Sequence, residues 1–162
     1  MALVAVGQRA PAFALTGPNG QPMRLSDWRG KIVVLYFYPK DDTPGCTREA
    51  CGFRDAIGEF RHSGADVIGI SRDSTASHQR FTDKYQLPFT LLSDPEAQAC
   101  KAYGVYAKKS LYGRLSWGIE RATFVIDPEG KIAAVFPKVK VDGHIDEVLR
   151  VIRELAQPSH VR

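Results

Sequence analysis

Hydrophobic residues recur along the chain with two spacings, one typical of buried strands and the other of amphipathic helices. Residues 31–38 (KIVVLYFY) form a nearly continuous run of β-branched and aromatic side chains, which predicts a central strand buried on both faces. Residues 65–71 (ADVIGIS) predict a second strand of the same kind. Between these strands, apolar and small residues recur at helical spacing from 47 to about 61, which predicts a connecting helix.

The same patterns predict further elements on both sides of this βαβ unit. Residues 4–25 contain short apolar stretches around the turn sequence GPNG at 17–20, and therefore predict short strands joined by a tight turn. A helix is predicted over 74–85, with Ser74 as its candidate cap. The later predicted elements are a short strand at 89–93, a short helix at 96–103, a hairpin formed by 121–127 and 131–136, and a closing helix at about 143–157. Residues 105–118 form a basic, glycine-containing connection for which the pattern predicts no element.

This order of elements predicts an α/β fold. Alternating strands and helices favour parallel pairing with right-handed crossovers, and a hairpin near the end implies a mixed sheet. We expect a mixed central sheet flanked by helices, with an N-terminal β-hairpin extension. The arrangement matches the thioredoxin-like fold, although the pattern alone also fits other small α/β folds.

Length and charge exclude several classes of protein. A chain of 162 residues is expected to form a single domain, 1–162, with a frayed tail at 158–162. A formal net charge of +4 without a dense Lys/Arg cluster argues against nucleic-acid binding. No apolar run approaches the roughly 20 residues of a membrane span, and the N-terminus lacks the features of a signal peptide. We therefore expect a cytoplasmic protein without nucleic-acid or membrane partners.

The chain contains three cysteines, which are too few and odd in number for a disulfide scaffold. In a reducing compartment, cysteines more often act as catalysts, ligands or buried apolar residues. The cysteines are Cys46, Cys51 and Cys100. Cys100 has no evident partner and is expected to be buried against the sheet. If exposed, it could react in place of Cys51 or link subunits. The four histidines show no ligand spacing with one another or with the cysteines, so no metal site is predicted.

Cys46 lies where chemistry is expected, after a buried strand and at the start of a helix. Sites in open α/β sheets form beyond the carboxyl ends of strands, and the free N–H groups of a helix N-terminus favour a thiolate. Gly45 lets the backbone approach a small ligand closely, and the Thr43 hydroxyl can form a hydrogen bond to such a ligand or to the sulfur. Asp41 and Asp42 are predicted to be solvated loop residues, because a nearby carboxylate would oppose ionisation of a thiol.

Residues 36–54 (YFYPKDDTPGCTREACGFR) resemble the active site of the peroxiredoxins, PxxxTxxC. In particular, they are similar to the bacterioferritin-comigratory branch of this family, also called PrxQ. The resemblance extends from residues 7–13 through 120–127 to the final helix and therefore covers nearly the whole chain. It implies a thioredoxin-like fold, a thiol peroxidase activity with an antioxidant role, and no bound cofactor.

The resemblance also implies roles for individual residues. Cys46 matches the peroxidatic cysteine, and Thr43 matches the threonine that orients the peroxide. Pro39 matches the proline that shields the thiolate from water and limits over-oxidation. Arg121 matches the arginine that polarises thiolate and peroxide, and a guanidinium fork suits charge growing on a leaving oxygen. From its position alone, Arg121 would instead be a surface residue paired with Glu120.

Glu49 lies three positions after Cys46, on the same side of the predicted helix. Two interpretations remain open for this residue. It either orients Arg121 or another arginine, or it is an ordinary acidic residue of the first turn that suits the helix dipole.

Cys51 matches the position of the resolving cysteine in one subgroup of the family, which implies an intramolecular Cys46–Cys51 disulfide. Five helical steps rise about 7.5 Å, so the two Cα atoms would lie roughly 8–9 Å apart. A disulfide needs Cα atoms within about 6.8 Å, so the first turns of the helix must unwind in each cycle. The exposed disulfide would then be reduced by thioredoxin or a similar dithiol. In the alternative, Cys51 is a packed helical residue that never reacts.

Two other functions compete with the peroxidase. The fold would suit a thiol–disulfide oxidoreductase, but the spacing here is CxxxxC rather than CxxC. A chaperone-like or binding role, with cysteines that only sense oxidants, is the third hypothesis. Trp28 and Trp117 are expected to pack in the core or at a pocket rim rather than to stack on a cofactor. A resolving cysteine within one helix favours a monomer, and the sequence leaves the preferred hydroperoxide open.

Overall fold

The computed structural model describes residues 2–156 of the chain, so the expected frayed tail lies outside the described residues. The strands are β1 (Ala14–Thr16), β2 (Pro22–Arg24), β3 (Ile32–Phe37), β4 (Ala65–Ser71), β5 (Thr90–Ser93), β6 (Tyr106–Leu111), β7 (Arg114–Ile119), β8 (Ala122–Ile126) and β9 (Ile132–Phe136). The helices are α1 (Pro44–His62), α2 (Thr75–Tyr85), α3 (Gln98–Ala102) and α4 (His144–Ala156), with short 3-10 turns at Pro18–Gly20 and Leu25–Trp28. Ser74 caps α2 as expected, because its side chain accepts a hydrogen bond from the backbone N–H of Ser77.

Seven strands form one mixed sheet in the order β2-β1-β5-β4-β3-β8-β9. The central strand β3 pairs in parallel with β4 and antiparallel with β8. Strands β1 and β2 form the expected N-terminal hairpin, and β8 and β9 form the expected late one. The mixed α/β sheet predicted from the element order is therefore confirmed.

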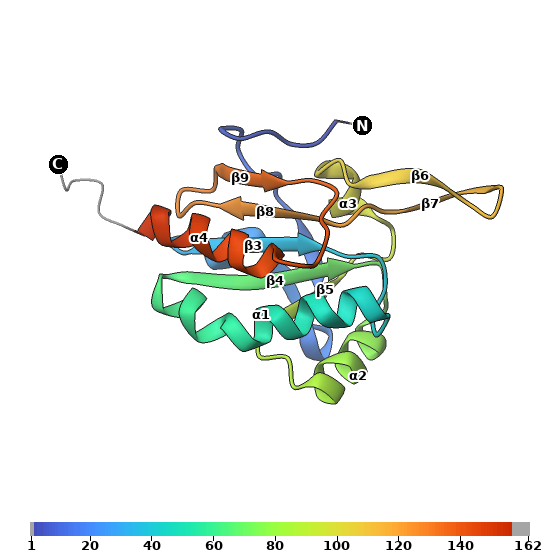
Figure 1. Ribbon diagram of the computed structural model, residues 1–162, viewed down its shortest axis with the longest axis horizontal. Helices are drawn as coiled ribbons and strands as arrows, with labels where there is room; N and C mark the ends of the chain where they lie inside the picture. The colour runs from blue at the N-terminus through green and yellow to red at the C-terminus, as the bar shows by residue number, and fades with distance from the viewer. Residues whose placement is uncertain (1, 157–162) are drawn as a thin grey trace.

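Strand β3 is buried on both sides, because other elements cover both faces of the sheet. Val34 and Tyr36 point to the face that packs against α1, α2 and α4. Val33, Leu35 and Phe37 alternate with them and point to the other face, which α3 and the N-terminal segment cover. Figure 1 shows α1 and α4 lying side by side in front of the sheet.

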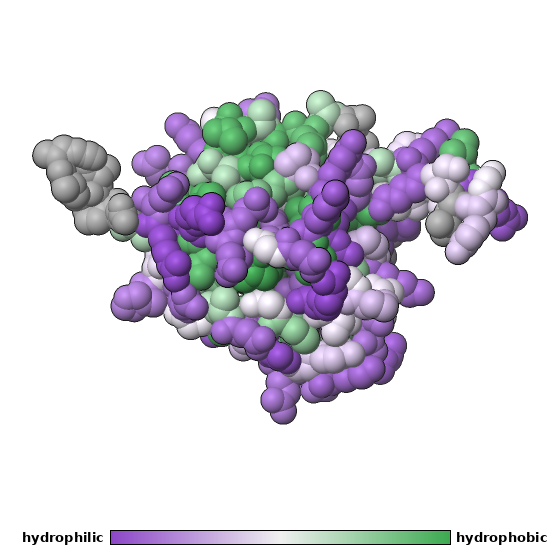
Figure 2. Space-filling model, viewed as in Figure 1, coloured by the Kyte–Doolittle hydropathy of each residue, from purple (hydrophilic) through white to green (hydrophobic). Residues whose placement is uncertain are grey.

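Residues 106–119, for which no element was predicted, form a two-stranded antiparallel hairpin, β6–β7. Its turn places Tyr112 and Gly113 at positive φ (53° and 76°), the backbone of a tight hairpin turn that Asn-Gly or Asp-Gly usually marks. The hairpin projects from the body of the protein (Figure 1), and Figure 2 shows both hydrophilic and hydrophobic side chains on it. Leu115 and Trp117 are exposed, so the expected packing of Trp117 is wrong: its ring stacks on Tyr106 within the hairpin.

Helix α1 begins at Pro44, three residues before the predicted start. Thr43 occupies the cap position with extended backbone, and Pro44 takes the first helical position, where its missing N–H is not needed. Cys46 therefore lies in the first turn of α1. Within residues 2–156, no helix has both the length and the apolar character that crossing a membrane requires.

Candidate active site

Cys46 lies in the first turn of α1, directly beyond the carboxyl end of the central strand β3. The loop between them, residues 38–43, is called the Cys46 loop below. Only 1% of Cys46 is exposed, and the side chain belongs to the core cluster under α1. The thiol thus lies buried at a helix N-terminus, where unpaired N–H groups are available as donors to a bound ligand.

Arg121 brings Cys46 and Glu49 together, although it lies 75 positions after the cysteine, immediately before β8. Its Nη2 donates to Cys46 Sγ at 3.3 Å, and its Nη1 donates to Glu49 Oε1 at 2.7 Å. The alternative that Arg121 pairs with Glu120 at the surface is wrong, since the ion pair goes to Glu49. Of the two interpretations of Glu49, the geometry supports the one in which it orients Arg121.

Glu49 is fully buried, and burial raises the pKa of its carboxyl to about 7 despite the opposing effect of Arg121. Among residues 2–156, its second oxygen, Oε2, finds no hydrogen-bond partner, and neither does the buried hydroxyl of Tyr36. Burial, followed by the charges of Glu49 and Cys46, also raises the pKa of Tyr36 well above its usual value. A neutral carboxyl at Glu49 would leave one net positive charge, on Arg121, to balance a thiolate.

The other predicted site residues, Thr43, Gly45 and Pro39, lie in the Cys46 loop and at the start of α1. The Thr43 hydroxyl donates to the Lys40 carbonyl at 2.8 Å, so its free lone pairs can accept a hydrogen bond from a substrate. Any side chain at Gly45 would crowd Arg121, because a Cβ there would lie 3.2 Å from Nη2. Pro39 lies at the exposed start of the loop, and its shielding role stays a prediction.

Lys109 is a charged residue near the site that the sequence did not single out. Its ammonium group donates to the carbonyl of Ile119, two residues before Arg121. Burial lowers the pKa of Lys109, and the charge of Arg121 lowers it further, whereas Glu120 and Cys46 oppose the shift. Lys109 approaches the site because β6 pairs with β7, with Lys109 opposite Ser116. The sequence held no signal for this pairing.

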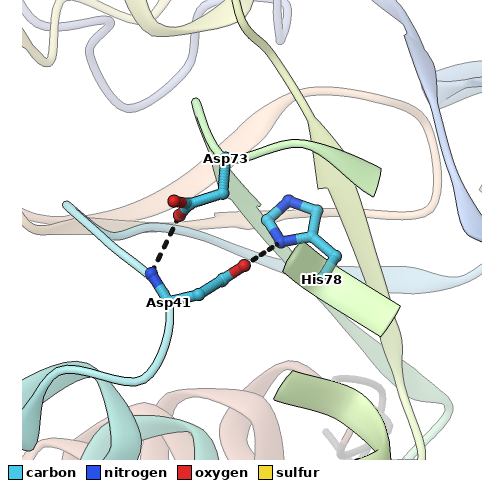
Figure 3. A group of neighbouring side chains, drawn as sticks. All are labelled: Asp41, Asp73 and His78. Atoms are coloured by element: carbon cyan, nitrogen blue, oxygen red, sulfur yellow. Dashed lines mark hydrogen bonds and ion pairs between the residues drawn. The ribbon is translucent and has the colours of Figure 1, made fainter. Parts of the chain in front are cut away.

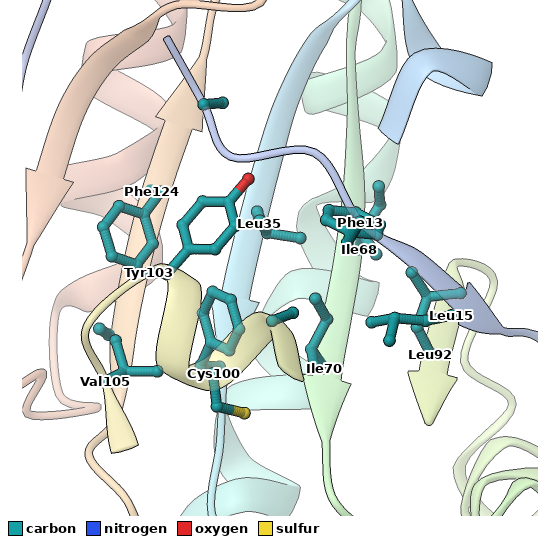
Figure 4. Packing of buried hydrophobic residues seen from close by; sticks show 14 of the residues in the cluster. Phe13, Leu15, Leu35, Ile68, Ile70, Leu92, Cys100, Tyr103, Val105 and Phe124 are labelled. Carbon is teal, nitrogen blue, oxygen red and sulfur yellow. The ribbon is translucent and has the colours of Figure 1, made fainter. Parts of the chain in front are cut away.

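The two other cysteines differ in accessibility. Cys51 lies in the same helix as Cys46 and is partly exposed, and both thiols are free. Cys100, on α3, is buried in the cluster drawn in Figure 4, as expected. Burial, followed by the neighbouring Asp94, raises the pKa of the Cys100 thiol far above its usual value. Cys100 is therefore poorly suited to thiol chemistry.

Asp41 was predicted to be solvated, and this is wrong. It is buried beside His78 of α2, with Asp41 Oδ2 2.7 Å from His78 Nδ1, while its backbone N–H donates to Asp73 (Figure 3). In residues 2–156, these three form the one group close enough to hold a metal ion together. Their polar atoms already bond to one another and to nearby hydroxyls, so the group fits a hydrogen-bond network. Asp42 is exposed, as predicted.

Comparisons with known proteins are consistent with this site. Residues 6–135 match the family model described as AhpC/TSA family. The chain belongs to the AhpC/TSA family, the peroxiredoxins. A Coxiella burnetii protein provisionally named peroxiredoxin bcp is 56% identical over 146 residues, covering 90% of this chain and 97% of the relative. Peroxiredoxin Bcp of Bacillus subtilis is 45% identical over 154 residues, covering 95% and 98%.

A solved structure of this branch has the same fold. The bacterioferritin comigratory protein of Xanthomonas campestris, described with its alkyl peroxide reduction activity, superposes with a TM-score of 0.88 at 39% identity. The match covers 94% of this chain and all of that one. The expected thioredoxin-like fold and the resemblance to the bacterioferritin-comigratory branch are thus confirmed. This peroxiredoxin is a thiol peroxidase with an antioxidant role.

Proposed function

We propose that Cys46 is the peroxidatic cysteine and that it reduces hydrogen peroxide and organic hydroperoxides. Its thiolate attacks one peroxide oxygen, the O–O bond breaks, and sulfur becomes a sulfenic acid. The other oxygen leaves as hydroxide or alkoxide and takes up a proton, which yields water or an alcohol. The observation that carries the proposal is the 3.3 Å contact from Arg121 Nη2 to Cys46 Sγ in the first turn of α1.

Arg121 and Thr43 prepare the peroxide for attack in this proposal. The guanidinium holds the thiolate before the reaction and the charge on the leaving oxygen during it. The Thr43 hydrogen is engaged by the Lys40 carbonyl, so Thr43 Oγ1 accepts the hydrogen bond of the peroxide. Gly45 leaves room for the oxygen pair beside the guanidinium, and Pro39 keeps water from the sulfur.

Cys51 resolves the sulfenic acid. Its thiol attacks the oxidised sulfur of Cys46, the S–O bond breaks, water leaves, and a disulfide forms. Both residues belong to the helical span Pro44–His62, in which five residues correspond to a rise of about 7.5 Å. The start of α1 therefore unwinds before the bond closes. Because Cys100 is buried, Cys51 is the better candidate for the disulfide partner of Cys46.

The disulfide is recycled by thioredoxin or a similar dithiol protein. The reductant thiolate attacks one sulfur, and its second thiol completes the exchange, so the chain regains two thiols. The alkyl peroxide reduction activity described for the Xanthomonas relative supports organic hydroperoxides as substrates beside hydrogen peroxide. We further propose that the chain works as a single domain and as a monomer, since both cysteines come from one helix.

The test is peroxide-dependent oxidation of NADPH coupled through thioredoxin reductase and thioredoxin. We expect Cys46→Ser to abolish turnover, and the matched control Cys100→Ser, at a buried thiol, to retain it. Full activity of Cys46→Ser would overturn the proposal. Reduction of insulin disulfides without peroxide would instead support the thiol–disulfide oxidoreductase.

A further inference from the structure

The Cys46 loop is attached to α2 by two neighbouring carboxylates. On the outside, Asp42 accepts hydrogen bonds from Lys84 Nζ at 2.8 Å and from the Tyr85 hydroxyl at 2.9 Å. Asp42 has a positive φ of 55°, which aspartate tolerates better than most residues. On the inside, Asp41 contacts Ser77 and His78 of the same helix. The residues just before the cap of α1 are thereby fixed to a second helix.

The inner contact holds a proton that the bonding pattern requires. His78 Nε2 lies 3.0 Å from the Leu92 carbonyl, which can only accept, so this nitrogen carries a hydrogen. The other nitrogen, Nδ1, lies 2.7 Å from Asp41 Oδ2, and that contact also needs a hydrogen. A neutral histidine has one N–H, so the Asp41–His78 pair holds one further proton between its members.

Other polar groups around the pair favour a charged Asp41. The Tyr38 hydroxyl, at the end of β3, donates to Asp41 Oδ1 at 2.6 Å, and Ser77 Oγ donates to Oδ2 at 2.8 Å. Asp73, before α2, is occupied by the backbone N–H of Asp41 and the hydroxyl of Ser71. An Asp41 that accepts from Tyr38, Ser77 and His78 is a carboxylate, and the proton then rests on the imidazole.

We propose that His78 is a positioning residue of the peroxidase, which holds the Cys46 loop through a buried ion pair with Asp41 and so sets Thr43 and Cys46 against Arg121. The inference rests on the proposed function in taking Cys46 as the peroxidatic cysteine. His78 touches none of the reacting atoms. It acts through Asp41, two positions before Thr43 and five before the thiol, and both members of the pair are at least 95% buried at the side chain.

The attachment depends on the N–H that His78 Nδ1 presents to Asp41 Oδ2. Without that donor, the buried carboxylate loses one of its partners and the loop loosens. Thr43 and Cys46 then lose their alignment, and peroxide reduction slows. Misplacement of a reacting group by about 1 Å can lower a rate roughly a hundredfold, so a loosened loop has a measurable effect.

Two substitutions separate the hydrogen bond to Asp41 from the rest of the His78 side chain. His78→Leu removes the contact, whereas His78→Asn supplies a side-chain N–H near the place of Nδ1. The control is His62→Asn, at an exposed histidine of α1. The measurement is the second-order rate constant of Cys46 with hydrogen peroxide at neutral pH, determined by competition with a second peroxidase. Thermal unfolding under the same conditions ensures that every variant is folded in the assay.

The expected result is an unchanged rate constant in His62→Asn. His78→Leu should be about ten- to a hundredfold slower at neutral pH, with His78→Asn recovering most of the loss. An unchanged rate constant in His78→Leu, or a His78→Asn variant as slow as His78→Leu, would overturn the inference. If His78→Leu does not fold, His78→Gln, whose amide lies near the place of Nε2 and not of Nδ1, replaces it in the comparison. The proposed function fails separately, if Cys46→Ser still reacts with peroxide.

Discussion

Arg121 is shared by two acidic side chains, and this sharing explains why an arginine rather than a lysine stands there. One nitrogen faces the sulfur of Cys46 and another faces Glu49, so the planar fork spans both groups at once. A lysine ammonium on a flexible stem would hold one partner and leave the other buried without its donor. The position of the charge, and not only its sign, is therefore expected to control the reaction.

Arg121→Lys tests this point. We expect kcat/KM for hydrogen peroxide to fall about 100- to 1,000-fold, the usual effect of removing one donor to a developing oxyanion. The matched control is Arg48→Lys, on the same helix as Cys46, which alters a solvent-exposed ion pair with Asp142 and should change kcat/KM less than about twofold. An Arg121→Lys enzyme within about threefold of the wild type would show that charge alone suffices.

Glu49 makes the stability of the protein depend on pH in a defined direction. Its pKa is about 7 in the folded protein and 4.5 as the ordinary value, so the folded state binds more protons between these pH values. The stability from this group is thus complete below pH 4.5 and is lost as pH rises to 7. Relative to Glu49→Gln, the free energy of unfolding of the wild type should fall by roughly 3 kcal/mol over this interval, as measured by urea denaturation. A constant difference between the two proteins would contradict the assignment.

At the scale of elements, the proposed cycle makes two demands on α1: its first turns unwind, while the rest stays attached to α4. Gly52, one residue after Cys51, marks the attached part, because a Cβ there would lie 2.7 Å from Ile145 Cγ1. We expect Gly52→Ala to destabilise the protein by about 1–3 kcal/mol through overpacking. Gly58→Ala, in the same helix with open space around it, should instead stabilise it by about 0.5–1 kcal/mol. Equal effects at both positions, measured by urea denaturation, would mean that α1 and α4 are not tightly packed at Gly52.

The elements that the sequence predicted well are those with a strong hydrophobic pattern. The run that became β3 and the periodic stretch that became most of α1 required no knowledge of the rest of the chain. The start of α1 was missed because Pro44 and Gly45 carry no apolar signal. Hairpin β6–β7 was missed because exposed strands lack the alternation that burial imposes, and its turn is Tyr-Gly rather than a usual turn pair.

For the candidate site, local spacing and resemblance named residues that lie close in sequence or carry a family motif. Cys46, Thr43 and Arg121 were predicted in this way, and the structure brings Arg121 into contact with Cys46. The burial of Asp41 could not be inferred, because its partner His78 lies 37 positions away on another helix. Composition alone makes an aspartate in a polar loop look solvated, and only the packing of α2 against the Cys46 loop reverses that expectation.

At the scale of the whole molecule, the structure divides into a packed body and a projecting hairpin. The body holds the site between β3, α1 and the start of β8, whereas Tyr112, Leu115 and Trp117 of the hairpin are exposed. Truncation of a leucine to alanine should therefore affect the free energy of unfolding differently in the two parts. Leu35 in the body is 0% exposed and Leu115 in the hairpin is 70% exposed, so this pair measures the difference.

Leu35→Ala should lower the free energy of unfolding by about 2–5 kcal/mol, since it opens a cavity in the middle of the sheet. Leu115→Ala should change it by less than about 0.5 kcal/mol, because no core contact is lost. Urea denaturation of both variants gives the two values. A loss above about 2 kcal/mol for Leu115→Ala would mean that the hairpin is covered in solution, for example by a second copy of the chain.

The central claim, that Cys46 is oxidised and Cys51 resolves it, is tested most directly by mapping disulfides. The reduced protein is treated with one equivalent of hydrogen peroxide, alkylated, digested without reduction and analysed by mass spectrometry. The account predicts one intramolecular Cys46–Cys51 disulfide and an alkylated Cys100. A Cys46–Cys100 bond, or no intramolecular bond at all, would contradict it.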